Sequence, residues 1–233
     1  MRSHETEVLL DASPEQVWRA LTEPAQVQRW FAPNVSIVPG AGGSSVATWA
    51  EGVSWANGIE VWEPGRHLRL VEDRPRDGGT PVRLVQDWFL EARAGGQTRL
   101  RLVHSGFGDS AAWDGEFDAT RQGWPACFAA LRMALGPFAG RPCRFTHVSR
   151  LTGKPVAGAL ETLLGAVPAS AAVIGQGPRA RVLDLGGGAL LTFAVERGPE
   201  GQGVVFLQVR AYGDQDPAEE WKLALERLFP AAA

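Results

Sequence analysis

Residues 12–22 read Ala12-Ser13-Pro14-Glu15-Gln16-Val17-Trp18-Arg19-Ala20-Leu21-Thr22 and contain a complete helix start. Ser13 supplies an N-cap hydroxyl, Pro14 has the fixed φ that suits the first helical position, and Gln16 stands where a capping box needs it. The apolar side of this helix consists of Val17, Ala20 and Leu21. Because Pro24 interrupts the pattern, we expect one short helix followed by a second helical turn.

The segments on either side of this helix indicate β-structure. Residues 5–11 alternate in polarity, which predicts a half-buried strand before the helix. After the helix, glycine-rich and proline-rich turns such as Pro64-Gly65 and Asp77-Gly78-Gly79 separate a series of β-like runs. The runs are 35–38, 46–50, 58–62, 67–72, 82–92 and 98–104. Tight turns between consecutive runs favour one antiparallel sheet.

A long helix is predicted for residues 118–135, where the apolar residues follow a helical period. Trp124, Phe128, Leu131 and Leu135 fall on one face of it. The fold class is therefore α+β, a curved antiparallel sheet wrapped around a long C-terminal helix. The space between a helix and a strongly curved sheet is a natural place for an elongated apolar pocket.

Four segments resemble, in the correct order, the family named for an activator of the heat-shock protein 90 ATPase. They are residues 12–22 with Trp30-Phe31-Ala32-Pro33, Gly58-Ile59-Glu60-Val61-Trp62-Glu63-Pro64, residues 98–107, and Gly123-Trp124-Pro125. The resemblance covers residues 5–138 and implies a START-like, Bet v 1-like helix-grip fold of the SRPBCC superfamily. That superfamily includes lipid carriers, polyketide cyclases and co-chaperones, so the resemblance alone leaves the function open.

We predict two domains, a helix-grip domain at residues 1–140 and a smaller α+β domain at residues 141–233. The second contains a predicted helix at 154–164, β-like runs at 180–185, 189–196 and 203–212, and a final helix at 217–229. This domain is either a shortened helix-grip repeat that has lost central strands or an unrelated appendage. The repeat is suggested by the order of its last elements, a strand, a turn, a strand and a helix with a tryptophan, which parallels residues 89–131. So small a region is expected to bury apolar surface against residues 1–140 or against a second copy in a homodimer.

Composition restricts the classes of partner. The chain has 23 basic and 26 acidic residues and a net charge of −3, with no basic stripe, so we expect no nucleic-acid binding. No run approaches the roughly 18 apolar residues of a spanning helix, and no targeting segment is evident, so we expect a cytoplasmic protein without a membrane partner. Cys127 and Cys143 are expected to be free thiols.

Two segments resemble parts of cofactor or metal sites. The segment Arg181-Val182-Leu183-Asp184-Leu185-Gly186-Gly187-Gly188 is similar to the strand and glycine loop of a methyltransferase. A β-like run follows it where a nucleotide site needs a helix, so we predict a hairpin and no cofactor. Cys127, Cys143 and His147 form an incomplete soft-metal set, and residues 143–147 are expected in the linker between the domains. We therefore predict no metal.

Asp87 and His104 are the only candidates for catalysis. They fall on neighbouring predicted strands, where they would form an acid–base pair if both faced a cavity. A solvent-facing Asp87 and a structural hydrogen bond from His104 are the alternatives, because alternation does not say which way either points. No nucleophile elbow, Walker loop or HExxH motif is present. The sequence favours a protein that is not an enzyme.

The leading hypothesis is the binding of a small hydrophobic or aromatic molecule between the long helix and the sheet. Nine tryptophans against one tyrosine supply large apolar faces. The expected ligand-binding residues are Trp49, Trp55, Trp62, Trp88, Leu102, Trp124, Phe128 and Leu131, although the stripe on the helix is also typical of plain core packing. The alternatives are a chaperone-related protein-interaction module and a cyclase or hydratase that uses the cavity.

Overall fold

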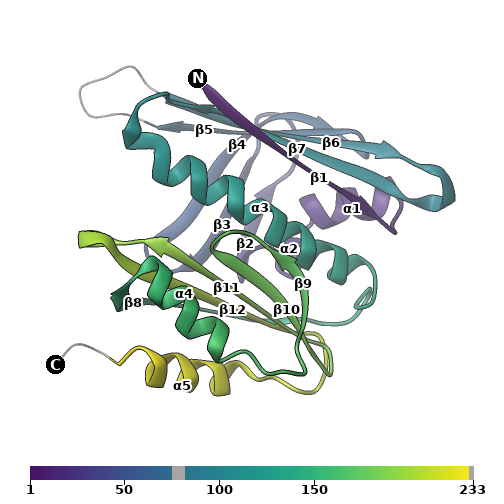
Figure 1. Ribbon diagram of the computed structural model, residues 1–233. Helices are drawn as coiled ribbons and strands as arrows, with labels where there is room; N and C mark the ends of the chain where they lie inside the picture. The colour runs from purple at the N-terminus through teal and green to yellow at the C-terminus, as the bar shows by residue number, and fades with distance from the viewer. Residues whose placement is uncertain (75–81, 231–233) are drawn as a thin grey trace.

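The computed structural model describes residues 1–74 and 82–230 and arranges them in layers (Figure 1). A seven-stranded antiparallel sheet forms one outer layer, and the long helix α3 (Asp114–Leu135) lies against it. A five-stranded antiparallel sheet covers the other side of α3, and two further helices form the last layer. The predicted α+β fold class, a helix-grip region followed by a smaller α+β region, is confirmed.

The elements are as follows. The first region contains β1 (Arg2–Leu10), α1 (Pro14–Thr22), α2 (Pro24–Val27), β2 (Asn34–Val38), β3 (Ser44–Ala50), β4 (Val53–Glu63), β5 (His67–Arg74), β6 (Val82–Ala92), β7 (Thr98–Phe107) and α3. The second contains β8 (Arg144–Pro155), α4 (Val156–Gly165), β9 (Ala172–Gln176), β10 (Ala180–Gly186), β11 (Ala189–Arg197), β12 (Gln202–Ala211) and α5 (Ala218–Leu228). Short 3₁₀ turns lie at Ala94–Gly96, Ala111–Trp113 and Pro199–Gly201. The predicted turn at Asp77-Gly78-Gly79 lies outside the described residues.

The start of α1 has the predicted capping box. The Ser13 hydroxyl accepts a hydrogen bond from the backbone N–H of Gln16 at 3.3 Å, and the Ser13 backbone N–H donates to Gln16 Oε1 at 2.8 Å. Two backbone donors of the first turn are thus satisfied at the point where the chain leaves β1. Pro24 then begins α2, as the interruption of the pattern indicates.

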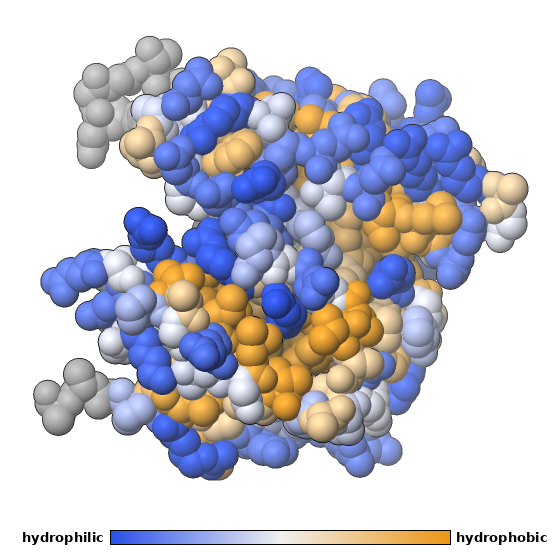
Figure 2. All heavy atoms as spheres, in the orientation of Figure 1, coloured by the Kyte–Doolittle hydropathy of each residue, from blue (hydrophilic) through white to orange (hydrophobic). Residues whose placement is uncertain are grey.

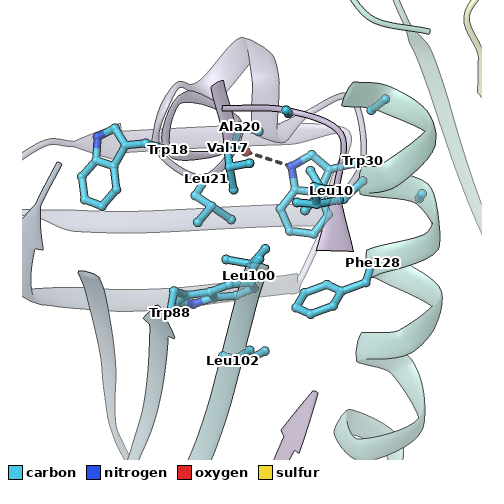
Figure 3. Close-up of a cluster of buried hydrophobic side chains, with 14 of the residues drawn as sticks. Leu10, Val17, Trp18, Ala20, Leu21, Trp30, Trp88, Leu100, Leu102 and Phe128 are labelled. Carbon is cyan, nitrogen blue, oxygen red and sulfur yellow. Dashed lines mark hydrogen bonds between the residues drawn. The ribbon is translucent and has the colours of Figure 1, made fainter. Parts of the chain in front are cut away.

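The first sheet has the strand order β1-β7-β6-β5-β4-β3-β2, so each consecutive pair from β2 to β7 is a neighbour and β1 closes on β7. Its inner face packs against α1 and α3 (Figure 3). Trp30 belongs to this core and donates its indole N–H to the Ala20 carbonyl of α1 at 2.8 Å. Trp88 and Phe128 meet across the core with ring centroids 5.9 Å apart.

The second sheet has the order β8-β12-β11-β10-β9. This is the arrangement of the first sheet with two strands fewer, since β8 corresponds to β1, β12 to β7 and α5 to α3.

Two strands of the second sheet were not predicted from the sequence. β8 occupies residues expected to form a linker and the start of a helix, and β9 occupies an unassigned stretch; both are edge strands of the sheet. The exact division into domains at residue 140 stays a prediction.

The second sheet packs one face on α3 and the other on α4 and α5. Val182 on β10 is buried against Ala126 and Ala129 of α3. Leu183, on the opposite face of the same strand, belongs to the core formed with α4 and α5. The expected contact between residues 141–233 and residues 1–140 is therefore present, and α3 lies between two sheets.

The glycine-rich segment after β10 forms a hairpin turn. Gly186, Gly187 and Gly188 all have positive φ, at 80°, 61° and 87°, which only glycine adopts readily. β11 follows directly and pairs antiparallel with β10. No helix begins at this loop, so the predicted hairpin is confirmed and a methyltransferase loop is excluded. Among the described helices, none is long and apolar enough to cross a membrane.

Candidate functional site

The space between α3 and the first sheet is almost filled by side chains. A cavity of about 40 Å³ remains there, bordered by Trp55, Trp88 and Trp124 among others. Phe128, Leu131 and Leu102 are 2%, 0% and 1% exposed and belong to the packed core. The long pocket expected inside residues 1–140 is therefore far smaller than a typical ligand site. The indole rings occupy the volume that the curved sheet leaves open.

Trp62, another residue expected to bind ligand, lies away from this space. Its ring packs edge-on against Trp18 of α1, with centroids 5.1 Å apart. Trp62 lines neither of the two cavities that Trp55 and Trp124 border. The structure thus gives Trp62 a role in holding α1 against the sheet.

A larger cavity, of about 440 Å³, lies between the first region and the second sheet. We call it the cleft. Its lining residues are Phe31, Trp49, Val53, Trp55, Ala119, Thr120, Gly123, Trp124, Cys127, His147, Glu196, Phe206 and Gln208. Figure 2 shows the outline of the molecule indented between the layers that carry the two sheets. Three of the predicted ligand-binding residues, Trp49, Trp55 and Trp124, line this cleft.

Three rings form a parallel aromatic group on the first-region side of the cleft. Phe31 and Trp124 have centroids 5.6 Å apart and planes 6° apart, and Trp55 and Trp124 are 5.9 Å and 16° apart. Phe31 and Trp55 complete the set at 6.3 Å and 22°. We call these three residues the aromatic platform. The plane of the Trp49 ring is at 76° to that of Phe31, and the Trp49 indole N–H donates to the Phe31 carbonyl at 3.2 Å.

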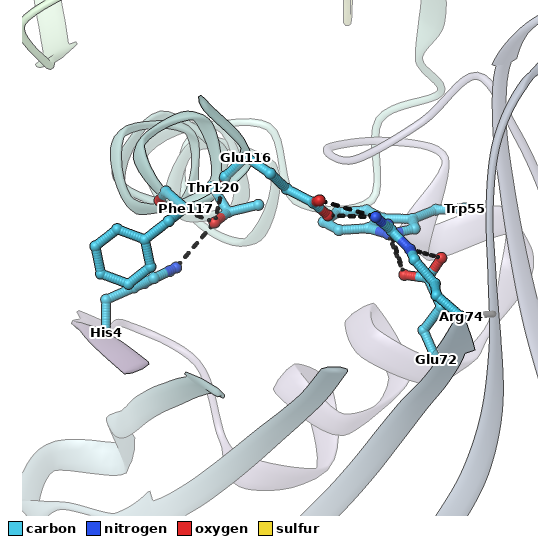
Figure 4. A network of polar contacts seen from close by, with 7 residues as sticks. All are labelled: His4, Trp55, Glu72, Arg74, Glu116, Phe117 and Thr120. Atoms are coloured by element: carbon cyan, nitrogen blue, oxygen red, sulfur yellow. Dashed lines mark hydrogen bonds and ion pairs between the residues drawn. The ribbon is translucent and has the colours of Figure 1, made fainter. Parts of the chain in front are cut away.

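A charged network holds Trp55 in place (Figure 4). The Trp55 indole N–H donates to Glu72 Oε2 at 2.9 Å. Glu72 also accepts two hydrogen bonds from Arg74, at 2.6 and 3.0 Å, and Arg74 pairs with Glu116 of α3 at 2.7 Å. Because charge-assisted hydrogen bonds are short and directional, this network links β4, β5 and α3 and fixes the orientation of the indole.

The second sheet supplies the opposite wall of the cleft. His147 on β8 and Gln208 on β12 are direct partners in the antiparallel register. Phe206 is two positions along β12, and Glu196 on β11 pairs with Val204. Because side chains alternate along a strand, Phe206 and Gln208 share the face that looks toward α3. This wall is polar at both ends and aromatic between them.

The polar groups of this wall have shifted protonation equilibria. Burial raises the pKa of the Glu196 carboxyl, and the Arg179 guanidinium, 3.3 Å away, opposes that rise. Burial and the charge of Arg210 both lower the pKa of His147. His147 is therefore neutral at neutral pH, and its Nδ1 atom has no hydrogen-bond partner among the described residues.

Arg210 lies behind this wall and is 1% exposed. Its guanidinium donates to the Thr192 hydroxyl at 3.1 Å, the Trp30 carbonyl at 2.7 Å and Gln208 Oε1 at 2.8 Å. It also lies over the Phe145 ring, 4.2 Å from the centroid. All three hydrogen-bond acceptors are neutral oxygens, and within the described part of the chain no carboxylate pairs with Arg210.

Asp87 and His104 are not an acid–base pair. Gln86 is the residue opposite His104 in the register, so Asp87 points to the other face of the sheet. There it accepts hydrogen bonds from Arg69 at 2.7 and 3.1 Å and lies 2.7 Å from His67. Burial tends to raise the pKa of Asp87, but Arg69 and His67 bring it below its ordinary value. The predicted catalytic pairing is wrong, because strand alternation separates the two side chains.

His104 lies inside the core, as the structural alternative required. Its Nδ1 accepts a hydrogen bond from the Trp124 indole N–H at 3.3 Å. Burial lowers its pKa to about 3, with smaller contributions from His4 and Arg74. The ring is neutral at neutral pH, and it helps to orient one ring of the aromatic platform.

The cysteines and His147 do not assemble a metal site. Cys127 and His147 both line the cleft, whereas the Cys143 thiol contacts the Arg29 carbonyl at 3.8 Å. Both thiols are free, and burial raises the pKa of Cys127 to about 11. Residues 1–74 and 82–230 contain no group of three or more His, Cys, Asp or Glu side chains placed to hold a metal ion.

Comparison with known families places the first region. The family model described as Activator of Hsp90 ATPase homolog 1-like protein matches residues 11–136. The chain belongs to this family. The match covers the capping box of α1, six of the seven strands of the first sheet (β2 to β7) and all of α3. It confirms the resemblance that the four sequence segments indicate.

Two solved structures are similar to this chain over different lengths. The protein MLL2253 from Mesorhizobium loti is 25% identical, with a TM-score of 0.52 over 58% of this chain and 98% of its own. DynU16, a protein of the dynemicin biosynthetic locus, is 19% identical, with a TM-score of 0.50 over 97% of this chain and 93% of its own. The second likeness concerns the fold alone, and it spans both regions. A search of curated proteins found no match.

Ten of the residues that line the cleft were not predicted from the sequence. They are Phe31, Val53, Ala119, Thr120, Gly123, Cys127, His147, Glu196, Phe206 and Gln208. Phe31 belongs to the family-like segment Trp30-Phe31-Ala32-Pro33, which was a usable signal. The residues of the second sheet carry no such signal, because they reach the cleft only through the packing of that sheet on α3.

Proposed function

We propose that the protein binds a small, flat aromatic molecule in the cleft, with its rings against the aromatic platform. The observation that carries this proposal is the set of parallel Phe31, Trp55 and Trp124 rings on one wall of a cavity of about 440 Å³. Ligand pockets of about 300–1,000 Å³ with mostly apolar walls and a few polar groups are typical of small-molecule sites.

The arrangement favours planar over branched ligands. Offset parallel stacking is a preferred geometry of aromatic rings and contributes about 0.5–1.5 kcal/mol per pair beyond the burial of area. Phe206 lies on the opposite wall, between the polar positions of the second sheet. A flat molecule would therefore be enclosed by aromatic side chains from both regions. Both regions are then needed for the complete site.

Two glycines of α3 allow a matched test. The Cβ of a residue at Gly123 or at Gly115 would meet no atom within 4 Å, but only Gly123 lines the cleft. Replacing a glycine inside a helix gains helix propensity, so the stability of each variant is measured together with its binding. Gly123→Phe is expected to fill the cleft, and Gly115→Phe to leave it open.

The measurement is the fluorescence of the neutral probe N-phenyl-1-naphthylamine, titrated with the full chain and followed by thermal melting of each variant. We expect Gly123→Phe to weaken binding by about tenfold or more, which corresponds to roughly 1.4 kcal/mol, and Gly115→Phe to bind as wild type. If the wild type fails to bind the probe, or if both variants retain full affinity, the cleft is not the ligand site.

A further inference from the structure

The polar groups of the second-sheet wall are separated into two ends. Gln208 on β12 and His147 on β8 lie side by side at one end. Glu196 stands at the other, opposite Val204, which is four positions from Gln208 and hence about 13 Å along a strand at roughly 3.3 Å per residue. A two-ring ligand on the aromatic platform would thus have chemically different surroundings at its two ends.

At the first end, Arg210 fixes which way the Gln208 amide points. A guanidinium has only donors, so it must face the amide oxygen, and Arg210 Nη2 indeed donates to Gln208 Oε1 at 2.8 Å. The amide nitrogen, with its two N–H donors, is left for the cleft that Gln208 lines. His147 adds a neutral imidazole beside it. This end of the cleft is therefore suited to a hydrogen-bond acceptor.

The charge at this end is also positive. A buried charge is costly unless an opposite charge compensates it, and Arg210 has only neutral oxygens as hydrogen-bond partners. Its charge reaches the cleft, because it lowers the pKa of His147 and acts in the same direction on Cys127. At the other end, Arg179 already neutralises Glu196. An anion is therefore favoured next to Gln208, and the paired carboxylate at the other end offers it no net attraction.

We propose that the cleft selects planar aromatic acids and binds them as anions, with the acidic oxygen at Gln208 and His147 and the rings on the aromatic platform. The ligand class is an aromatic carboxylate or phenolate. Gln208 and His147 contact the anion, and Arg210 is a positioning residue that orients Gln208 and supplies the charge from behind the wall. This inference rests on the proposed function, since it assigns the orientation of a ligand in the same cleft.

The test compares two probes of the same shape, 2-naphthoate and 2-naphthamide, by quenching of tryptophan fluorescence with the full chain. Both carry a carbonyl that accepts from the Gln208 amide, so the ratio of their dissociation constants reports the charge. We expect 2-naphthoate to bind about tenfold more tightly, because hydrogen bonds to a charged acceptor are roughly twice as strong.

Substitutions of Arg210 and Gln208 separate charge from folding. Arg210→Met is expected to abolish the preference for 2-naphthoate, and Arg210→Lys to retain most of it. Gln208→Glu gives Arg210 a carboxylate partner and places that negative charge at the cleft, so the preference is expected to reverse to 2-naphthamide while the melting temperature is kept or raised. Arg144→Met is the control, because Arg144 lies on β8 but pairs with Asp216 outside the cleft.

The outcomes of this test are distinguishable from those of the proposed function. Equal affinity for the two probes in wild type, or a preference for 2-naphthoate that survives Gln208→Glu, would overturn the anion assignment and leave the aromatic site intact. Failure of both probes and of N-phenyl-1-naphthylamine to bind would overturn the site itself. Because Gln208→Glu does not remove the buried arginine, the test remains decisive even if Arg210→Met does not fold.

Discussion

Arg210 of β12 donates a hydrogen bond to the backbone carbonyl of Trp30, which lies 180 positions earlier in the chain. A second such contact runs from the Tyr212 hydroxyl to the Arg29 carbonyl. Both join β12 or the residue directly after it to the segment that follows α2. Buried polar contacts need defined geometry, so these bonds fix how the second sheet sits on the first region. The shape of the cleft depends on the same relationship.

The close approach of β9 to α3 gives a first prediction. A Cβ atom at Gly175 would lie 2.8 Å from Ala129 Cβ of α3, whereas one at Gly153 on β8 would meet nothing within 4 Å. We expect Gly175→Ala to reduce the free energy of unfolding by about 1–3 kcal/mol through overpacking. Gly153→Ala is the control and is expected to change it by less than about 1 kcal/mol. Denaturant unfolding measures both, and equal effects would show that the contact with α3 does not restrict residue 175.

Buried histidines give a second prediction, about pH. Burial lowers the pKa of His104 to about 3 and that of His4 to about 4, below the value near 6.5 expected in the unfolded chain. At a pH between the folded and the unfolded pKa, each histidine is protonated in the unfolded chain and neutral in the folded protein. Each histidine therefore contributes stability that is complete above about pH 6.5 and is lost as the pH falls, by up to about 1.4 kcal/mol per pH unit.

Two replacements of His104 that cannot titrate check this pH dependence. His104→Asn and His104→Phe differ in packing and in hydrogen bonding to Trp124, so their stability at pH 8 is expected to differ. In both variants, the free energy of unfolding should nevertheless depend less steeply on pH between about pH 4.5 and 6. The decrease in slope should be the same in both and equal to roughly half of the contribution of the two histidines. An unchanged slope in both variants would mean that His104 takes up its proton without a penalty in the folded protein.

Local sequence signals predicted the elements of the first region because each signal acts within a few residues. Ser13 and Gln16 form the capping box that their spacing indicates, and the glycine turns separate the strands where expected. β8 and β9 were missed for a physical reason. Neither strand has the strict alternation of buried and exposed side chains that marks a half-buried strand, and β9 contains Gly175.

The candidate site was predicted only in part, because it is assembled by packing between regions. Trp49, Trp55 and Trp124 were expected to bind ligand and do line the cleft. The direction of a side chain on a strand cannot be read from alternation alone when both faces carry large residues, so the sequence left open whether Asp87 and His104 share a face. Gln208 and His147 meet the platform only because the second sheet covers α3, and no local signal contains that information.

The network behind Trp55 gives the last prediction. Glu72 accepts hydrogen bonds from both Trp55 and Arg74, and Glu72→Gln leaves one oxygen for two donors while turning an N–H group toward one of them. We expect Trp55 to lose its fixed orientation and the affinity for N-phenyl-1-naphthylamine to fall by about threefold to tenfold, the range of one hydrogen bond. The neutral probe is chosen because its binding does not respond directly to the removed charge. Glu60→Gln is the matched control, since Glu60 is also on a strand of this sheet and pairs with an arginine, Arg83, but does not line the cleft; an exposed pair of this kind contributes about 0–1 kcal/mol. Equal affinity in the two variants would show that the platform keeps its geometry without the network.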